Sequence, residues 1–382
     1  MGTPFTFGIV GSGWRAEFFV RLARLLPDQL TLVGASVRRS EAAEQLTQRW
    51  SAPAFLSPKE LIRSRQPDFV ISCVPWSANP EVVTALVESG VHVLSETPPA
   101  PDLDGLRKLW AQVGSHHLVQ VAEQYLLMPG HAARRELVTR GVIGQPTSVQ
   151  VSSTHNYHAV SMIRGLLRVG FEPVKVAAAR FIAPLVDPLS RTGWTGDDTP
   201  KEAATTLATL DFGGASGLYD FTDNQWHNQL RLRRIVIRGS HGEIADDMVM
   251  RLAGGRTILK SFLTRSQLGY DLNLDGYDTE HISFEGDVLY RNPYLGLRLM
   301  DEEIALTSLL IATGTWARGD GPPPYPLAQG CQDHLIGLAI EESAATGVPI
   351  VTGVSRGAAN EEKHSYICSA NRKVHLAEIV LD

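Results

Sequence analysis

The first informative segment is Phe5-Thr6-Phe7-Gly8-Ile9-Val10-Gly11-Ser12-Gly13-Trp14-Arg15-Ala16. Its apolar run, Phe5 to Val10, predicts a buried strand that ends in closely spaced glycines. From Trp14 to Leu26, apolar residues recur at helical spacing. The segment therefore predicts a strand, a tight turn and a helix in direct succession.

The pattern Gly11-x-Gly13-x-x-Ala16 lies at this turn, which is the context that a dinucleotide fingerprint requires. Gly11 allows the tight turn, Gly13 lets a diphosphate approach the backbone, and Ala16 lets helix and strand pack closely. The helix N-terminus supplies N–H donors and partial positive charge to phosphates. Trp14 and Arg15 are further candidate cofactor-binding residues. The alternative is an ordinary strand–helix turn without a ligand.

Strands and helices alternate over the first third of the chain. Further strands are predicted at 30–37, 68–74, 92–94 and 118–121, and helices at 40–50, 80–88 and 102–113. Ser40 and Ser57 are expected to cap helices. Alternation of this kind implies a parallel sheet with right-handed crossovers. We expect a doubly wound Rossmann dinucleotide-binding domain over residues 1–126, within an α/β fold.

Beyond Gln124 the pattern changes. A helix is predicted at 130–140, and strands at 147–153, 205–212, 217–221, 232–238 and 243–245. Strands in succession imply an antiparallel sheet, which two late helices at 301–316 and 327–345 are expected to cover. Residues 127–382 are therefore predicted to form an α+β substrate-binding and oligomerisation domain with an open, mainly antiparallel sheet.

The end of the second predicted strand reads Ala35-Ser36-Val37-Arg38-Arg39-Ser40 and holds no carboxylate. An acidic residue here would bind the ribose hydroxyls of NAD, whereas arginine suits the 2′-phosphate of NADP. Arg38 and Arg39 therefore favour NADP, with NAD as the alternative. In that case the two arginines would stack on the adenine or face solvent.

Composition limits the possible partners. The net charge of −6 argues against a nucleic-acid surface. Three widely spaced cysteines, Cys73, Cys331 and Cys368, suggest neither a disulfide framework nor a zinc site. The N-terminus lacks a signal-peptide pattern, and no apolar run approaches a membrane span. We expect a cytoplasmic protein that binds neither membrane nor metal.

Several segments occur in a characteristic order. They are the glycine loop, Val74-Pro75, the stretch 91–100 with Glu96-Thr97-Pro98, Gly141-Val142-Ile143-Gly144, and the stretch 342–350. Together they resemble the glucose–fructose oxidoreductase and inositol dehydrogenase family, Gfo/Idh/MocA. The resemblance implies hydride transfer between a nicotinamide and a sugar, cyclitol or related small molecule. It also implies a homo-oligomer formed through the open sheet, and it makes Pro75 and Glu96 candidate cofactor-binding residues.

The catalytic positions of the family are altered in this chain. Thr97 replaces the lysine of the family's Glu-Lys-Pro motif, and Thr154 replaces an aspartate. His158 falls on the family's histidine, while Ser161 replaces a further common acid. The resemblance thus points to a cofactor site beside a rebuilt catalytic centre.

His158 is the leading candidate for the general acid or base, because imidazole can serve either role near neutral pH. Tyr157 and His155 are close in sequence and are candidate helpers. Thr97 can form a hydrogen bond or relay a proton, although its hydroxyl is a poor acid. The alternative for His158 is a buried histidine that caps the following helix.

Three further groups of residues have structural interpretations that compete with a site role. The segment Asn224-Gln225-Trp226-His227 could line a sugar pocket, but packing across the sheet is the stronger interpretation. Gln332-Asp333-His334 could cap a helix or reach a cleft. Asp197-Asp198 indicates a solvated loop.

The leading hypothesis is an NADP-dependent oxidoreductase on a polyhydroxylated or cyclic small molecule, with His158 as acid or base. One alternative is a redox-neutral enzyme that uses its bound cofactor transiently. The other is a non-catalytic sensor or scaffold that binds a dinucleotide.

Overall fold

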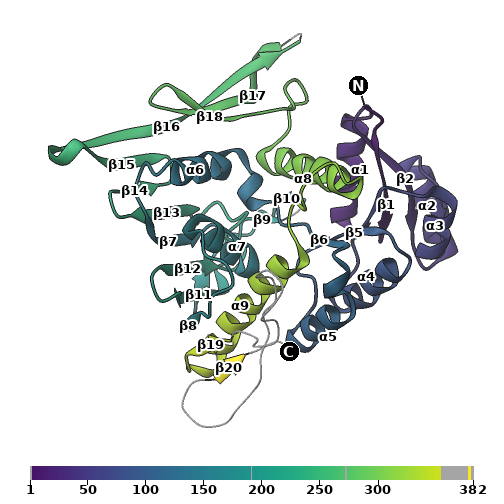
Figure 1. The fold of residues 1–382 in the computed structure, drawn as a ribbon, viewed down its shortest axis with the longest axis horizontal. Coiled ribbons are helices and arrows are strands. Elements are labelled where there is room, and N and C mark those ends of the chain that lie inside the picture. Colours follow the sequence, from purple (N-terminus) through teal and green to yellow (C-terminus); the bar gives the residue numbers. More distant parts are fainter. Residues whose placement is uncertain (1, 191, 272, 354–376, 380–382) are drawn as a thin grey trace. The chain divides into compact units, whose positions relative to one another are not determined.

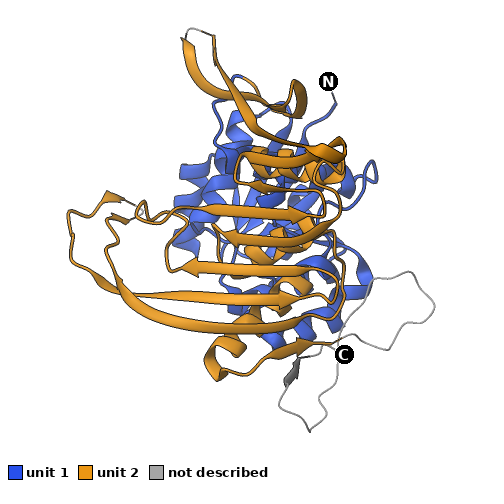
Figure 2. Ribbon diagram, turned by 90° about the vertical axis from the view of Figure 1, so that its left-hand side faces the viewer, with its two compact units in different colours: residues 1–128, 296–331 blue, residues 129–295, 332–382 orange. Residues whose placement is uncertain are grey.

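A computed structural model describes residues 2–190, 192–271, 273–353 and 377–379. Cys368 lies outside the described residues. The chain forms two compact units (Figure 2): unit 1 comprises residues 1–128 and 296–331, and unit 2 comprises residues 129–295 and 332–382. The boundary after residue 128 lies near the domain boundary predicted after residue 126. Residues 296–331, by contrast, were expected in the C-terminal domain and pack with unit 1.

Unit 1 is built on a parallel sheet. In its described residues the strands are β1 (Phe5–Val10), β2 (Leu30–Ser36), β3 (Ala54–Phe55), β4 (Phe69–Ser72), β5 (His92–Ser95) and β6 (Val119–Val121). Figure 1 labels β1, β2, β5 and β6 of this sheet. The spatial order of the strands is β3-β2-β1-β4-β5-β6. This is the order of the doubly wound dinucleotide-binding fold, in which the chain direction across the sheet reverses between β1 and β4. The predicted Rossmann domain is confirmed.

Helices connect these strands. They are α1 (Trp14–Leu25), α2 (Ser40–Trp50), α3 (Pro58–Arg65), α4 (Asn79–Glu88) and α5 (Leu103–Val113), with 3-10 turns η1 (Trp76–Ala78), η2 (Gly114–His116) and η3 (Tyr125–Leu127). Ser57 caps α3 as expected, since its hydroxyl accepts a bond from the Glu60 N–H. The prediction for Ser40 was wrong, because Ser40 is the first helical residue of α2 and Arg39 occupies the N-cap position.

The prediction that both late helices cover the antiparallel sheet was wrong for α8 (Asp301–Ala317). This helix packs against β1, β4, α1 and η3 within unit 1. Gly314 lies so close to Phe5 that an added Cβ would come within 2.3 Å of its ring. Beyond the helix, Arg318 bonds the carboxylate of Asp68 and lies over the Phe5 ring. These contacts hold α8 on unit 1.

Unit 2 is built on a large sheet. Its strands are β7 (Pro146–Ser152), β8 (Lys175–Leu185), β11 (Lys201–Asp211), β12 (Ser216–Thr222), β13 (Arg234–Gly239), β14 (Gly242–Ala245), β15 (Met248–Ala253), β16 (Thr257–Tyr270), β17 (Asn273–Phe284), β18 (Asp287–Arg291), β19 (Ile350–Thr352) and β20 (Ala377–Ile379). Neighbouring strands of the described residues pair antiparallel, except β7 with β12 and β19 with β20. The predicted mainly antiparallel sheet is confirmed, although β8 and β15 to β18 were not foreseen.

Helices cover one face of this sheet. Helix α7 (Asn156–Leu167) packs on β7 and β12, and α6 (Pro129–Thr139) packs on β17 and β18. Within unit 2, α9 (Leu327–Thr346) meets β8, where the Ala178 N–H donates to the Ser343 hydroxyl. Strand residues facing the helices, such as Val149 and Ile237, are fully buried. The separate strands β9 (Leu189–Ser190) and β10 (Gly193–Trp194) form a small hairpin.

Candidate functional site

The glycine loop of unit 1 has the geometry of a phosphate-binding turn. Gly11 has a φ of +114°, and an added Cβ would lie 2.2 Å from the carbonyl oxygen of Cys73, so only glycine fits. Gly13 is the N-cap of α1, and a Cβ there would meet no atom within 4 Å. Ala16 is fully buried against the sheet. The loop therefore keeps a helix N-terminus open to an anion.

Two arginines follow β2 beside this loop. The Gly11 N–H donates to the carbonyl of Ser36, the last residue of β2, which joins the two segments. Arg38 and Arg39 are exposed, and neither forms an ion pair with the described residues. The end of β2 thus offers positive charge and no carboxylate.

Arg15, a predicted cofactor-binding residue, forms ion pairs with two carboxylates of the protein. Its Nη1 donates to Glu302 Oε1 over 2.8 Å, and its Nε lies 3.7 Å from Glu96 Oε1. The guanidinium also lies over the Trp14 and Phe18 rings. Trp14 is half-exposed, with 54% of its surface accessible. Arg15 therefore links the glycine loop to α8 and to the end of β5.

Glu96 and Thr97 lie at the carboxyl end of β5. The Glu96 N–H donates to the carbonyl of Ser72, and the Thr97 N–H donates to Glu96 Oε2 over 3.3 Å. Burial raises the pKa of the Glu96 carboxyl, and the positive charge of Arg15 offsets part of that rise. Pro75 is exposed just beyond β4. These residues lie at the sheet edge where dinucleotides bind in this fold.

Sequence reasoning missed Asn79, which anchors this loop. Its side chain is buried, accepts a bond from the Ser72 hydroxyl over 2.7 Å, and donates to Ser95 Oγ and to the Pro99 carbonyl. It thereby ties the ends of β4 and β5 to the loop carrying Thr97. An asparagine between a 3-10 turn and Pro80 carries no motif that would have revealed this role.

In unit 2, the candidate catalytic residues lie in the first turn of α7. His158 is buried, and its ring centroid lies 4.5 Å from that of Tyr157 and 5.2 Å from that of His155. His155, rather than His158, occupies the N-cap position of the helix. Tyr157 also contacts the ring of His334 at 5.6 Å. Histidines and aromatic rings thus form one cluster.

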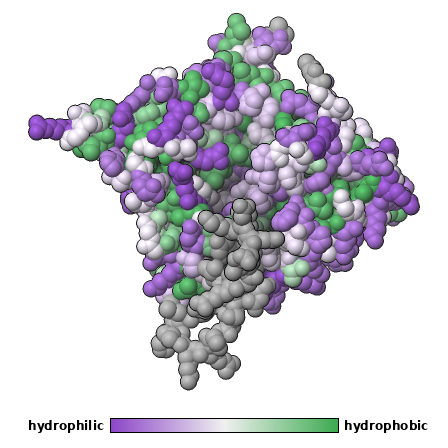
Figure 3. Space-filling view, in the orientation of Figure 1, coloured by the Kyte–Doolittle hydropathy of each residue, from purple (hydrophilic) through white to green (hydrophobic). Residues whose placement is uncertain are grey.

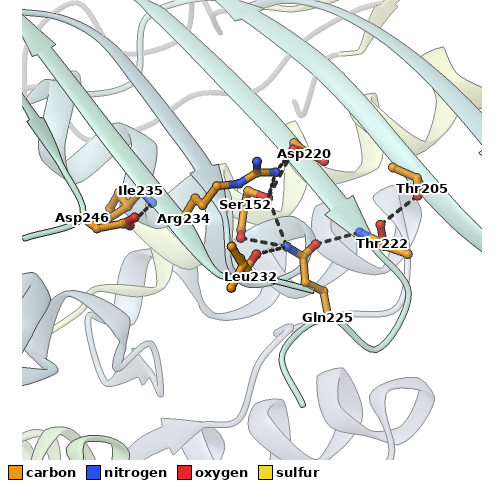
Figure 4. A network of polar contacts seen from close by, with 9 residues as sticks. All are labelled: Ser152, Thr205, Asp220, Thr222, Gln225, Leu232, Arg234, Ile235 and Asp246. Atoms are coloured by element: carbon orange, nitrogen blue, oxygen red, sulfur yellow. Dashed lines mark hydrogen bonds and ion pairs between the residues drawn. The ribbon is translucent and has the colours of Figure 1, made fainter. Parts of the chain in front are cut away.

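Other residues singled out from the sequence are structural. Gln225 bonds Thr222, Ser152 and the Leu232 carbonyl, which closes the loop after β12 (Figure 4). The Ser161 hydroxyl donates to the His158 carbonyl.

Two acidic candidates also have structural partners. Asp333 forms a buried ion pair with Arg164 of α7. Asp197 accepts a bond from the exposed Lys201. The packing interpretation of these polar residues is supported.

The described residues contain no group of three or more His, Cys, Asp or Glu side chains placed to hold a metal ion. Among them, no helix combines the length and apolar character needed to span a bilayer. The face seen in Figure 3 mixes hydrophilic and hydrophobic side chains.

The structure assigns the cofactor candidates, from Gly11 to Glu96, and Thr97 to unit 1. It assigns His158 and Tyr157 to unit 2.

Residues 5–124 match an oxidoreductase family with an NAD-binding Rossmann fold. D-glucoside 3-dehydrogenase of Escherichia coli (strain K12) is 28% identical over 153 residues, which are 37% of this chain and 41% of that protein. Myo-inositol dehydrogenase Hyg17 of Streptomyces leeuwenhoekii is 33% identical over 142 residues, which are 37% of this chain and 43% of that protein. The chain thus matches about two fifths of the length of these two relatives.

Structural similarity to known proteins covers more of this chain than these sequence matches do. The structure of levoglucosan dehydrogenase in complex with NADH and levoglucosan has a TM-score of 0.64 at 19% identity. The likeness covers 91% of this chain and 99% of that one. At this identity it shows a shared fold across both units.

Proposed function

We propose that this chain, whose residues 5–124 match the Gfo/Idh/MocA oxidoreductase family, is an NADP-dependent oxidoreductase. Its substrate is a sugar, a cyclitol or a related small molecule, as in the glucoside and inositol dehydrogenases that it resembles. His158 serves as the general acid or base.

The open glycine loop beside two exposed arginines carries this proposal. Gly13 leaves room for a diphosphate at the N-terminus of α1. Arg38 and Arg39 are the proposed partners of a 2′-phosphate, and neither is ion-paired with a carboxylate of the described residues. Bound NADP would supply or accept the hydride. Trp14, Pro75 and Glu96 complete the proposed cofactor site, with Arg15 holding Glu96.

His158 is the proposed proton donor or acceptor because the other motif positions lack a suitable group. Thr97 and Thr154 carry hydroxyls that do not ionise near neutral pH. Tyr157 packs on His158 and orients its ring. A carbonyl reduced by hydride takes up a proton, and alcohol oxidation releases one, so a single imidazole meets the need in either direction.

The cofactor assignment is tested by Arg38→Ala combined with Arg39→Ala. We expect the affinity for NADPH to fall by about 100-fold, because two charge-assisted contacts to the 2′-phosphate are lost. The affinity for NADH should change by less than about threefold, since NADH lacks that phosphate. Lys59→Ala with Arg63→Ala, on the exposed side of α3, removes the same charge elsewhere. Equal losses for both cofactors would refute the NADP assignment.

The replacement of lysine by Thr97 and of aspartate by Thr154 favours a second candidate function. In it, the chain binds the dinucleotide without any net oxidation or reduction of a substrate, either as a redox-neutral enzyme that uses the cofactor transiently or as a non-catalytic sensor. Cofactor retained stoichiometrically through purification, with no net oxidation or reduction of a broad substrate panel, would support this candidate. Activity gained by Thr97→Lys would identify a decayed enzyme.

A homo-oligomer formed through the uncovered face of the unit 2 sheet, in the cytoplasm, is part of the same proposal. Apolar side chains such as Phe181, Leu207 and Phe262 are exposed on strands β8, β11 and β16. Sedimentation of the purified chain as a monomer at micromolar concentration would rule this assembly out.

A further inference from the structure

Two carboxylates of unit 1 share a single arginine. Arg15 Nη1 donates to Glu302 Oε1 over 2.8 Å, and Arg15 Nε lies 3.7 Å from Glu96 Oε1. Neither carboxylate has a second ion pair within the described part of the chain. The other donor to Glu302 is the neutral amide of Gln124, at 3.1 Å. The three ionisable side chains therefore carry net negative charge when both carboxyls are ionised.

The carboxylate of Glu96 is incompletely compensated. Its side chain is only 16% exposed, and Oε1 is buried without a hydrogen-bond partner among the described residues. Native proteins seldom leave a buried polar atom unpaired, and a buried ionised carboxylate is costly unless a cation lies close to it. Arg15 compensates it only in part, because the same guanidinium also bonds Glu302. Glu96 can therefore accept a further positive charge.

The position of Glu96 in the sheet relates it to one half of the proposed cofactor. In this fold the diphosphate binds at the N-terminus of the first helix, and the adenosine ribose meets the end of the second strand. Strands β2 and β4 flank β1 on opposite sides, and β5 follows β4. The nicotinamide half would thus extend away from β2, toward the carboxyl ends of β4 and β5, where Glu96 directly follows β5. The nicotinamide ring is a cation in NADP⁺ and is neutral in NADPH.

We propose that Glu96 and Glu302 make unit 1 selective for the oxidation state of the cofactor, so that it binds NADP⁺ more tightly than NADPH. This inference rests on the proposed function for the identity of the dinucleotide. Carboxylates attract the nicotinamide cation but not the neutral ring, whereas the phosphates are the same in both forms and cancel in the comparison. A tenfold preference would lower the midpoint potential of the bound two-electron couple by about 30 mV, which makes that couple more reducing.

The groups that face Glu96 determine how the selectivity depends on pH. Burial raises the pKa of this carboxyl, Arg15 on α1 opposes that rise, and the negative charge of Glu302 on α8 adds to it. Glu123, after β6, also adds to it, and the Cys73 thiol, after β4, stays neutral because burial raises its own pKa. A cation beside Glu96 favours the ionised carboxylate. The preference for NADP⁺ is therefore expected to grow as the pH rises through the pKa of Glu96.

Equilibrium binding of the two cofactor forms measures the selectivity without any turnover. Titration calorimetry of the full chain should show NADP⁺ bound about tenfold more tightly than NADPH at pH 8, with a smaller ratio at pH 6. Glu96→Gln should lower this ratio of dissociation constants at least about threefold and remove most of its pH dependence. Glu302→Gln should lower it less, because the side chain of Glu302 is 37% exposed and its charge is screened by solvent.

Matched variants separate the effect of charge from damage to the fold. Glu96→Asp keeps the carboxylate and should retain most of the selectivity. Glu88→Gln removes an exposed carboxylate from the C-terminal end of α4 and should leave the ratio unchanged. A cooperative thermal unfolding transition would show that each variant is folded.

The inference is overturned if the wild type binds NADPH as tightly as NADP⁺, or more tightly, or if Glu96→Gln leaves the ratio unchanged. Equal binding of the two forms would leave the proposed function standing, whereas binding of neither form would refute the proposed function together with the inference. Selective binding of NADP⁺ without hydride transfer to any substrate would refute the proposed redox function and leave the selectivity standing.

Discussion

At the scale of single residues, Glu96 places a carboxylate where burial opposes its ionisation. Because its pKa is raised in the folded chain, the ionised form destabilises the fold above that pKa, and the cost disappears as the pH falls below the ordinary value near 4.3. Glu96→Gln should therefore gain stability relative to the wild type at pH 7 and lose that advantage by pH 4. Urea unfolding at both pH values measures the difference.

The control for this prediction is Glu44→Gln, which removes an exposed carboxylate from α2. If the stability difference between Glu96→Gln and the wild type is the same at pH 7 and pH 4, the ion pair with Arg15 fully offsets burial, and the pKa of Glu96 is not raised in the folded chain.

At the scale of elements, Asn79 holds the loop after β5 to the ends of two strands. Asn79→Ala should lower the free energy of unfolding by about 1–3 kcal/mol, because buried hydroxyl and carbonyl groups lose their partner. It should also weaken NADPH binding, since the loop carrying Glu96 and Thr97 loses its anchor. Denaturant titration and fluorescence titration report the two effects.

Ser89→Ala, which removes a hydroxyl that donates to the Ala85 carbonyl in the last turn of α4, is the matched control. An Asn79→Ala variant with normal stability and normal NADPH affinity would show that the loop is held by other contacts.

Most strands and helices of residues 5–121 could be predicted because they show their own apolar periodicity, and many of them end at or beside glycine, proline or serine. Which of the two units α8 packs against could not be predicted. Its sequence is apolar around much of its circumference, and it is held on unit 1 by contacts between distant residues, such as that of Gly314 with Phe5, some 300 residues apart in sequence. Strands β15 to β18 were missed because exposed apolar residues such as Ile258 blur the alternation.

At the scale of the whole molecule, the candidate cofactor site of unit 1 was more predictable than the candidate catalytic cluster of unit 2. Gly11 and Gly13 act through backbone geometry, which a short motif encodes directly. The cluster around His155, His158 and Trp226 joins α7 to the loop after β12, and its ring contacts depend on three-dimensional packing. The sequence therefore favoured packing for Trp226, where the structure also shows exposure.

We propose that this chain transfers hydride with His158 as acid or base. The most direct measurement follows the reduced-nicotinamide absorbance of the purified chain with NADP and sugars or cyclitols, for the wild type, His158→Ala and the exposed control His116→Ala. We predict turnover by the wild type and His116→Ala, and a rate at least about 100-fold lower for His158→Ala at unchanged NADP affinity. Equal rates for His158→Ala and the wild type, or no absorbance change with any variant, would contradict the claim.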